Sequence, residues 1–430
     1  MKRSVRTSAA MLALAMGVSL FAGCGSSNEP KKVGETNSNT NQKAQKTTMR
    51  VVSFAVGEDP FKPAWQATLK KFQDQNPNVE IIDESTPDAN DALRTKVKTD
   101  FASGNEPDFL WFYNGSDAKP LIDSGKLFTF DDELKKDTGW SGNITPGAIE
   151  AGKQNGKVYS IPVVGFYEAL FVNKDLFDAN GLKVPTNFEE FNTAVDTFKA
   201  KNIIPIGASI DESYYLLEYF VLSAAGKDGH AAEFKSSVPA NWANGIAALK
   251  EYYEKGAFPK DALTISDEAA RNLFYDKKAA MMINGSWSVG QVKDTKNTVV
   301  TYFPVIKDGK AGPKDVIGGF GTGFYLSKDQ NDKKNGLPLK LLKYMSSPEI
   351  VKTLTEKAGI PGVKIDTGAA SPVAKSGLDM FAGATSVNFP FGDRIDKEAF
   401  TNIRKNLAYV VTGKKSAEEL LNESLKLVKK

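Results

Sequence analysis

Residues 155–174 read NGKVYSIPVVGFYEALFVNK, and this stretch predicts how the chain is organised. The apolar, β-branched run at 158–164 suits a buried strand, and 169–172 reads as a second strand. Pro162 and Gly165 interrupt the pattern, because proline cannot donate to a sheet ladder and glycine weakens a strand. The sequence therefore predicts two strands with an irregular elbow between them.

The predicted elbow carries Phe166, Tyr167 and Glu168. This arrangement suits a connection between two lobes, because one strand leads into the elbow with its polar and aromatic groups and another strand leads out of it. We therefore expect these three side chains to face a cleft between the lobes.

The same stretch resembles the G-x-x-Y-x-I-P…Y-N-K-x-L-F segment of extracellular solute-binding proteins of ABC importers, the maltodextrin-binding-like group. The matching residues are Gly156, Tyr159, Ile161, Pro162, Asn173, Lys174, Leu176 and Phe177, with Val172 in place of the usual tyrosine. The resemblance implies an α/β fold of the periplasmic-binding-protein class II type. In that fold, two α/β lobes are joined by crossing hinge strands and the ligand cleft lies between them.

Length and composition describe an ordinary soluble globular protein. A chain of 430 residues favours two domains, and its 41% hydrophobic and 25% charged residues are typical of globular proteins. The formal charge of +3 includes Lys2, Arg3 and Arg6, which lie in a segment that we expect to be removed. The mature chain is then close to neutral and has no long basic block, so the sequence gives no sign of nucleic-acid binding.

Histidine and cysteine each occur once, as His230 and Cys24. Two such residues cannot supply a structural zinc site, and no disulfide can form within one chain. His230 lies in the polar stretch 226–230, which favours a surface histidine over a catalytic one. We therefore expect no metal and no cofactor.

The first residues predict export and lipid anchoring. Lys2, Arg3 and Arg6 precede a short apolar run, and residues 20–24 read LFAGC, which resembles the bacterial lipobox. The resemblance implies a signal peptide at 1–23 and a lipid on the thiol of Cys24. Residues 24–47 are polar and read as a flexible tether. The expected location is the extracellular face of the bacterial cytoplasmic membrane.

The body of the chain opens with a β-α-β-α-β pattern. Strands are predicted at 49–56, 79–84 and 108–112, and the helices between them present Trp65, Leu69 and Phe72, then Leu93, Val97 and Phe101, with Gly104 ending the second helix. This order predicts a parallel sheet, in which ligands meet the loops after the strands. The candidate ligand-binding residues in or beside these loops are Glu58, Asp59, Glu84, Trp111, Tyr113 and Asn114.

A second α/β unit follows the elbow. Thr186 and Glu189 form a predicted capping box, and a strand at 203–210 leads to the candidate Asp211. A strand at 279–283 delivers Asn284 and a turn ending at Trp287. We expect a short helix after this turn to offer N–H groups to a ligand oxygen.

The run AMMINGSW at 280–287 resembles the family motif A-M-x-I-x-G-x-W. Trp287 is a candidate for stacking on a sugar ring in the cleft. The alternative is that Trp287 belongs to the core of a lobe, where isolated aromatic residues usually lie.

Strands predicted at 302–306 and 317–326 return to the first lobe. Residues 318–323 read GGFGTG, but the spacing differs from G-x-G-x-x-G and a strand follows instead of a helix, so we reject a nucleotide site. The resemblance instead places Gly319 and Phe320 at the cleft edge. Helices are predicted at 339–345 and 349–358.

Two closing helices are predicted at the C-terminus. Phe400, near the start of one, is a ligand candidate, and Ser416 with Glu419 forms a second predicted capping box. The predicted domain bounds are 48–162 plus 304–362 for the N-terminal lobe and 163–303 plus 363–430 for the C-terminal lobe.

The resemblance implies a monomeric, lipid-anchored binding protein that captures a carbohydrate by hinge closure and delivers it to the permease of an ABC transporter. Several candidates are aromatic, which suits stacking on sugars, and others are acidic, which leaves non-sugar solutes open. An extracellular glycan-degrading enzyme is the competing class, because Glu58, Glu84 and Glu168 could pair across a cleft as acid and base. The sequence carries no G-x-S-x-G or zinc motif that would favour an enzyme.

Overall fold

The computed structural model describes residues 46–88, 91–356, 359–365 and 371–429. The predicted signal peptide, Cys24 and the tether up to residue 45 lie outside the described residues. From Lys46 onward the chain forms one compact unit. No helix in these described ranges is long and apolar enough to cross a membrane.

The first of two main sheets has four strands. Its order is β11 (Thr322–Leu326), β3 (Phe109–Tyr113), β1 (Thr47–Val52) and β2 (Val79–Asp83). β1 is parallel to both β2 and β3, as predicted, and β11 is antiparallel to β3. α1 (Lys62–Gln75) and α2 (Ala92–Ser103) connect these strands. Their predicted apolar faces are buried, and Gly104 ends α2 in a left-handed conformation.

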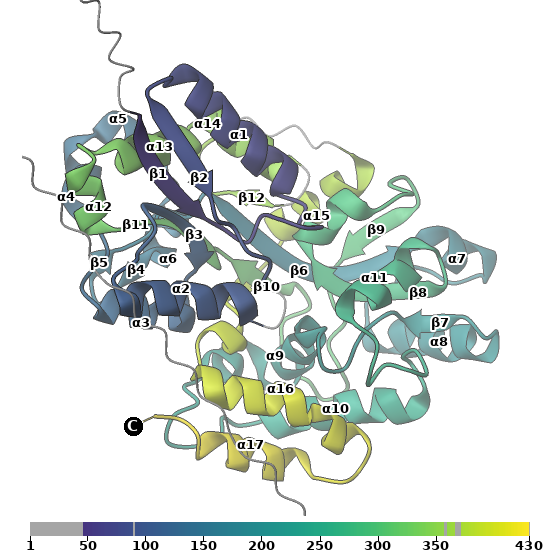
Figure 1. Ribbon diagram of the computed structural model, residues 1–430. Coiled ribbons are helices and arrows are strands. Elements are labelled where there is room, and N and C mark those ends of the chain that lie inside the picture. Colours follow the sequence, from purple (N-terminus) through teal and green to yellow (C-terminus); the bar gives the residue numbers. More distant parts are fainter. Residues whose placement is uncertain (1–45, 89–90, 357–358, 366–370, 430) are drawn as a thin grey trace, which may run out of the picture. The chain divides into compact units, whose positions relative to one another are not determined.

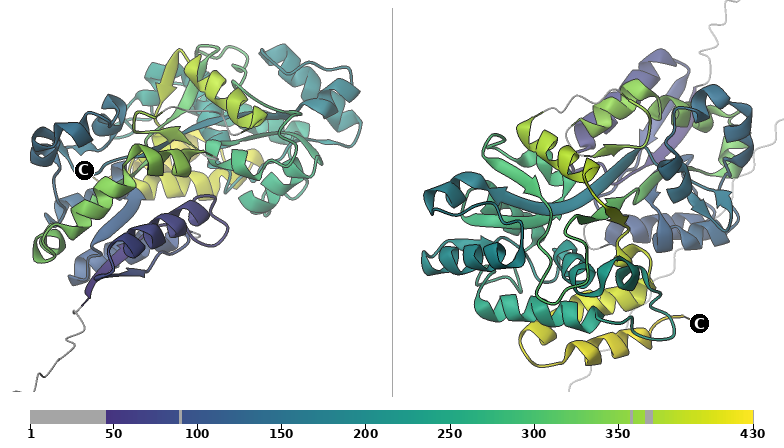
Figure 2. Two further views of the ribbon diagram at one scale, coloured as in Figure 1. Left: turned by 90° about the horizontal axis from the view of Figure 1, so that it is seen from above. Right: turned by 180° about the vertical axis from the view of Figure 1, so that it is seen from behind.

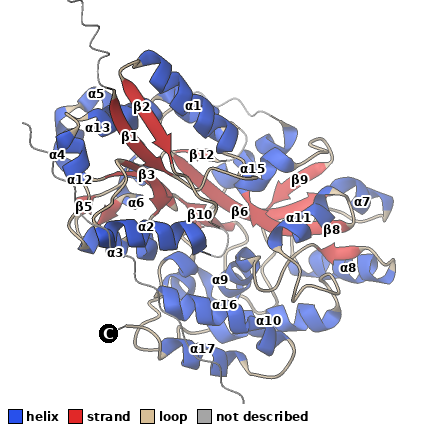
Figure 3. Ribbon diagram, viewed as in Figure 1, coloured by secondary structure: helices blue, strands red, loops and turns tan. Residues whose placement is uncertain are grey.

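Seven strands make up the second main sheet. The ordered path is β13 (Ser386–Asn388), β10 (Asp315–Gly319), β6 (Val164–Asn173), β8 (Ala279–Gly285) and β7 (Ile204–Ile206), while β9 (Thr298–Thr301) and β12 (Ile360–Pro361) also pair with β6. Figure 3 shows the strands in red. We call the elements on the four-stranded sheet the first lobe and those on the seven-stranded sheet the second lobe.

Helices cover both sheets, and β4 (Lys153–Gln154) with β5 (Lys157–Val158) forms a small hairpin. The first lobe also contains η2 (Gly115–Asp117), α3 (Lys119–Asp123), α4 (Asp131–Lys136), α5 (Thr138–Ser141), α6 (Pro146–Ala151), α12 (Lys328–Lys333), α13 (Leu337–Met345) and α14 (Pro348–Thr355). The second lobe contains α7 (Lys174–Ala179), α8 (Phe188–Ala200), α9 (Tyr214–Ala231), α10 (Trp242–Lys255), α11 (Asp267–Tyr275), η3 (Ser286–Gln291), α15 (Pro372–Ala382), η4 (Phe391–Asp393), α16 (Lys397–Val411) and α17 (Ala417–Leu425).

The predicted elbow is wrong: β6 is one continuous strand of ten residues. Its first residues pair with β12, the middle with β10, and the remainder with β8 and β9. This pairing supplies ladder hydrogen bonds through Gly165, so the break predicted there is absent, whereas the break predicted at Pro162 is present. Figures 1 and 2 show β6 running from the first lobe into the second.

Three other predicted strands differ from the structure. The strand predicted at 203–210 shortens to β7, and the strand predicted at 302–306 is irregular and follows β9. The strand predicted at 317–326 is divided into β10 and β11, which belong to different sheets. The chain therefore crosses between the lobes at residues 320–321, and the exact lobe bounds stay a prediction.

One predicted helix cap is shifted and the other is confirmed. Asn187, not Thr186, caps α8 by accepting from Glu190 N, and the Glu190 carboxylate reaches back to the Thr186 N–H. Asparagine is as good an N-cap as threonine, so the sequence pattern allowed either start. The capping box of Ser416 and Glu419 is present at α17.

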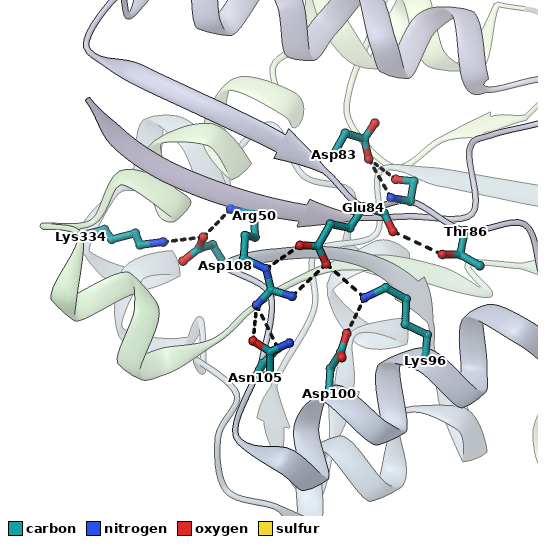
Figure 4. A network of polar contacts seen from close by, with 10 residues as sticks. Arg50, Asp83, Glu84, Thr86, Lys96, Asp100, Asn105, Asp108 and Lys334 are labelled. Carbon is teal, nitrogen blue, oxygen red and sulfur yellow. Dashed lines mark hydrogen bonds and ion pairs between the residues drawn. The ribbon is translucent and has the colours of Figure 1, made fainter. Parts of the chain in front are cut away.

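A network of charged side chains ties the first lobe together (Figure 4). Arg50 on β1 donates to both carboxylate oxygens of Glu84, at 2.8 and 2.9 Å. Asp108, which is buried, accepts from the Arg50 N–H and from Lys334 Nζ, the latter at 2.6 Å. Asp108 thereby joins the start of β3 to β1 and to the end of α12.

Candidate functional site

Trp287 lies where the two lobes meet. It is the second residue of η3, which follows β8, and its ring centre is 5.7 Å from that of Phe166 and 5.3 Å from that of Tyr215. The ring is partly exposed and contacts the hydrophobic cores of both lobes. Gly285 lies beneath it, since a Cβ there would collide with the ring. Trp287 therefore bridges the lobes and keeps some accessible surface.

A second group of rings comes from the loop after β1 and from the last residue of β3. Phe54 and Tyr113 stack with centres 5.7 Å apart, and the guanidinium of Arg94 lies 3.8 Å from the centre of the Tyr113 ring. Burial raises the pKa of the Tyr113 hydroxyl, and the nearby Arg94 charge partly opposes that shift. Such flat surfaces with polar edges suit a ligand that is apolar on its faces and polar at its rim.

Ion pairs fix the guanidinium of Arg94. Its Nε donates to Asp117 at 2.7 Å, and Nη1 contacts Asp88. Asp117 is only 2% exposed and also pairs with Lys397 Nζ of the second lobe at 3.6 Å. One Asp117 oxygen, Oδ1, has no hydrogen-bond partner in the described part of the chain.

Glu168 is a deeply buried acid at the junction of the lobes. It is 1% exposed, and its Oε2 has no hydrogen-bond partner among the residues that the structure describes. Burial raises its pKa well above the usual range, and the charges of Glu218 and Asp393 add to the shift. Ser286 Oγ, in the residue after the Glu168 pairing partner Gly285, is also buried without a described partner. A buried acceptor without a hydrogen bond lowers the stability of the folded state, so both oxygen atoms are suited to form hydrogen bonds with ligand hydroxyls.

Two further carboxylates at the junction have raised pKa values. Burial raises the pKa of Asp59 to about 6, opposed by the Phe61 N–H and the charge of Arg271. Burial, followed by the charge of Asp117, raises the pKa of Asp393 to about 7. Asp59 and Asp117 belong to the first lobe, whereas Arg271 and Asp393 belong to the second, so the charges of the two lobes act on each other.

Replacing Asp393 with asparagine is expected to stabilise the protein at pH 8 and to change little at pH 4. The folded-state pKa of about 7 exceeds the unfolded value of roughly 3.9, so the folded state binds more protons between these values and loses stability as pH rises. The expected gain in unfolding free energy at pH 8 is up to about 4 kcal/mol. Chemical denaturation at both pH values checks it. The control is Asp123→Asn, whose side chain is exposed on α3. If Asp393→Asn changes the unfolding free energy equally at both pH values, the raised pKa assigned to Asp393 is contradicted.

Two predicted aromatic residues lie in the core. Trp111 is 1% exposed, packs against Phe61 and Trp65, and donates through Nε1 to Thr322 Oγ1 at 3.1 Å. Tyr167 is buried against α15 because strand alternation turns it to the face of β6 opposite Phe166. The expectation that these rings line the cleft is therefore wrong.

Three predicted polar residues form hydrogen bonds or ion pairs within the protein. Asn114 donates to Phe320 O and accepts from Ser160 and Tyr325. Asn284 Oδ1 accepts from Gly285 N and Ser288 Oγ. Glu84 belongs to the ion-pair network of Figure 4. These bonds hold Asn114 and Glu84 within the protein and occupy only the oxygen of Asn284, so ligand contact by the three residues stays a prediction.

The other candidates have mixed surroundings. Phe400 is buried beside Tyr214, with ring centres 5.8 Å apart, and Glu58 is exposed. Asp211 lies 3.9 Å from Arg404, and its Oδ1 has no described hydrogen-bond partner. Gly319 and Phe320 line a groove of about 2000 Å³ whose lining also includes Asn114 and Asp393 but not Trp287. Ligand contact by these residues, as by Trp287, Tyr113, Glu168 and Asp59, stays a prediction.

Sequence reasoning missed several residues of the junction: Phe54, Arg94, Asp117, Tyr214, Tyr215, Arg271 and Asp393. Phe54 and Asp117 follow strands β1 and β3, so the rule about loops after parallel strands could have found them. Asp393 and Arg271 come from parts of the chain whose approach depends on tertiary packing, and no local pattern marks them. The described residues contain no cluster of side chains suited to hold a metal ion.

Comparison with known proteins agrees with this architecture. Residues 58–352 match the family model described as bacterial extracellular solute-binding protein. The multiple sugar-binding protein of Streptococcus mutans is 26% identical over 319 residues, which are 70% of this chain and 73% of that protein. The maltotriose-binding protein of Pyrococcus abyssi is 25% identical over 303 residues, which are 69% of this chain and 62% of that protein.

Solved structures share the fold. A chitin oligosaccharide binding protein superposes with a TM-score of 0.79 at 21% identity, covering 89% of this chain and 98% of that chain. The maltose/maltodextrin-binding domain of Bdellovibrio bacteriovorus bound to maltotriose gives 0.71 at 18% identity, covering 88% of this chain and 98% of that chain. These likenesses identify a class II binding-protein fold with two α/β lobes. Because the family model matches more than half of the sequence, this chain belongs to the bacterial extracellular solute-binding protein family.

Proposed function

We propose that this protein captures an oligosaccharide between its lobes and delivers it to the permease of an ABC transporter. The observation that carries the proposal is the junction of the lobes, where Trp287 is partly exposed and contacts both cores. The Trp287 ring lies against Gly285, and Gly285 pairs with Glu168, whose buried carboxylate oxygen Oε2 has no described hydrogen-bond partner. Aromatic faces stack on sugar rings, and carboxylates accept hydrogen bonds from sugar hydroxyls. The names of the sugar-binding relatives point in the same direction.

The proposed mechanism is hinge closure. Three segments at the junction link the sheets: β6, the step from β10 to β11, and the segment around β12. A ligand that contacts both lobes binds the closed state more tightly and so shifts the equilibrium toward it. No bond is made or broken in this process, and the protein acts as a monomer.

Isothermal titration against neutral oligosaccharides tests the proposal. Maltotriose, raffinose, xylotriose and triacetylchitotriose form the panel, and at least one should bind without being consumed. Chromatography of the mixture after incubation separates a binder from a glycan-degrading enzyme, because an enzyme leaves shorter products. Binding of amino acids or organic cations, with none of the sugars, would overturn the carbohydrate assignment in favour of another solute.

We further propose that a lipid on Cys24 anchors the protein to the outer face of the cytoplasmic membrane. Replacing Cys24 with serine should release the body into the medium or leave an uncleaved precursor. Cell fractionation with immunoblotting distinguishes these products from the anchored form. A Cys24→Ser variant that is processed normally and stays in the membrane fraction would contradict the anchor.

A further inference from the structure

The second lobe buries a glutamate and the only histidine of the chain side by side. Glu218 and His230, both on α9, are each 0% exposed, and His230 Nε2 lies 3.0 Å from Glu218 Oε2. The sequence had predicted a surface histidine, and that prediction is wrong. The stretch 226–230 is helical apart from Gly226, where α9 is kinked, so His230 turns inward.

The carboxylate of Glu218 holds the η4 turn. Its Oε2 accepts from Phe391 N at 3.0 Å, and its Oε1 accepts from Gly392 N at 2.8 Å. No lysine or arginine in the described residues forms an ion pair with Glu218, so these two N–H groups and His230 provide its hydrogen bonds. A buried carboxylate needs such donors, and the position of η4 is therefore coupled to Glu218.

The η4 turn touches the first lobe. At Gly115 in η2 an added Cβ would lie 2.5 Å from the carbonyl oxygen of Asp393, the last residue of η4. Two residues after Gly115 comes Asp117, which holds Arg94 beside the Tyr113 ring and pairs with Lys397 at the start of α16. Within the second lobe, the Phe391 ring of η4 packs against Phe400 with centres 5.8 Å apart.

We propose that Glu218 and His230 are positioning residues for ligand capture. They hold η4 against η2, so that the second lobe meets the first in the geometry that encloses the ligand. This inference rests on the proposed function, because it assumes that the ligand is bound between the lobes. A purely structural pair would affect stability alone. A positioning pair also affects the distance between the lobes and the ligand affinity.

The distance between the lobes can be measured without knowing the ligand. In the full chain with Cys24→Ser, Lys119→Cys on α3 and Lys405→Cys on α16 take spin labels, because both side chains are exposed. Double electron–electron resonance then reports the separation. Glu218→Gln keeps the shape of the side chain but places an amide group, in place of the carboxylate, against the η4 N–H groups. His230→Leu removes the donor to Glu218. His230→Gln retains a donor and should restore the distribution of the parent chain.

Asn173→Ala is the matched control. Asn173 is buried in the same lobe and bonds the carbonyls of Phe274 and Ala279, so its loss destabilises the lobe without touching η4. We expect Glu218→Gln and His230→Leu to broaden and lengthen the distance distribution, while Asn173→Ala leaves it unchanged at similar loss of melting temperature. Affinity for a sugar bound by the parent chain should fall about fivefold or more in the first two variants.

Unchanged distances in Glu218→Gln and His230→Leu would overturn the inference, whatever the ligand. Changed distances with no binding of any sugar by the parent chain would support the positioning pair and count against the carbohydrate assignment. Changed distances with unaltered affinity would also overturn the inference, because η4 would then play no part in ligand capture.

Discussion

Trp287→Ala is expected to weaken ligand affinity by about one to two decades. A stacked indole and its buried area supply roughly 2–3 kcal/mol of binding free energy. Because the ring is only partly exposed and packs on Phe166 and Tyr215, some stability is lost as well. That loss should be less than the roughly 3–5 kcal/mol expected for a fully buried tryptophan. Isothermal titration with a sugar from the panel and chemical denaturation measure the two effects.

Trp140→Ala provides the matched control for this prediction. Trp140 is also half-buried, but it lies on α5 of the first lobe and donates to Ser346 Oγ at 2.8 Å. Its replacement should reduce stability and leave the dissociation constant unchanged. If Trp287→Ala instead loses as much stability as a core tryptophan and still binds tightly, Trp287 belongs to the core and not to the site.

Asp108→Ala is expected to cost about 3–5 kcal/mol of unfolding free energy, because it leaves buried partners unsatisfied. The Arg50 N–H and Lys334 Nζ both lose their acceptor, and β3 loses its link to β1 and α12. Urea denaturation measures the change. Ligand affinity of the remaining folded protein should stay within about twofold, since distant and independent sites do not couple.

The control for this loss is Asp178→Ala. Asp178 pairs with Lys174 on the surface of α7, where both side chains are well exposed, and such pairs contribute about 0–1 kcal/mol. A loss at Asp108 no larger than the loss at Asp178 would mean that the network of Figure 4 contributes little to the first lobe.

Much of the fold could be predicted because local patterns and tertiary packing agree. Trp65, Leu69 and Phe72 repeat at helical spacing and form the buried face of α1. Gly104 ends α2 because glycine adopts the left-handed conformation easily. The alternation of strands and helices then allowed only a parallel arrangement for β1, β2 and β3.

The crossing strand was mispredicted for a tertiary reason. Gly165 weakens an isolated strand, yet β6 continues through it because β12 and β10 supply pairing partners from residues far away in the chain. The split of 317–326 into β10 and β11 has the same origin. Local sequence does not determine which sheet a strand joins.

The candidate site was predicted in part. Trp287 and Glu168 lie at the junction, but Trp111 and Tyr167, which are aromatic like Trp287, are core. Whether a ring after a strand points into the cleft or into the lobe depends on the side of the sheet it faces and on what packs there. Likewise, Glu84 is held by Arg50 and Lys96, and neither partner is adjacent to it in sequence.

Small-angle scattering with and without a saturating sugar from the panel tests the central claim, capture by hinge closure, most directly. Wild-type protein should show a smaller radius of gyration with the sugar than without it, and Trp287→Ala should need a higher sugar concentration to reach the same value. A radius that does not change at saturation, as established by titration of the same sample, would contradict capture by closure.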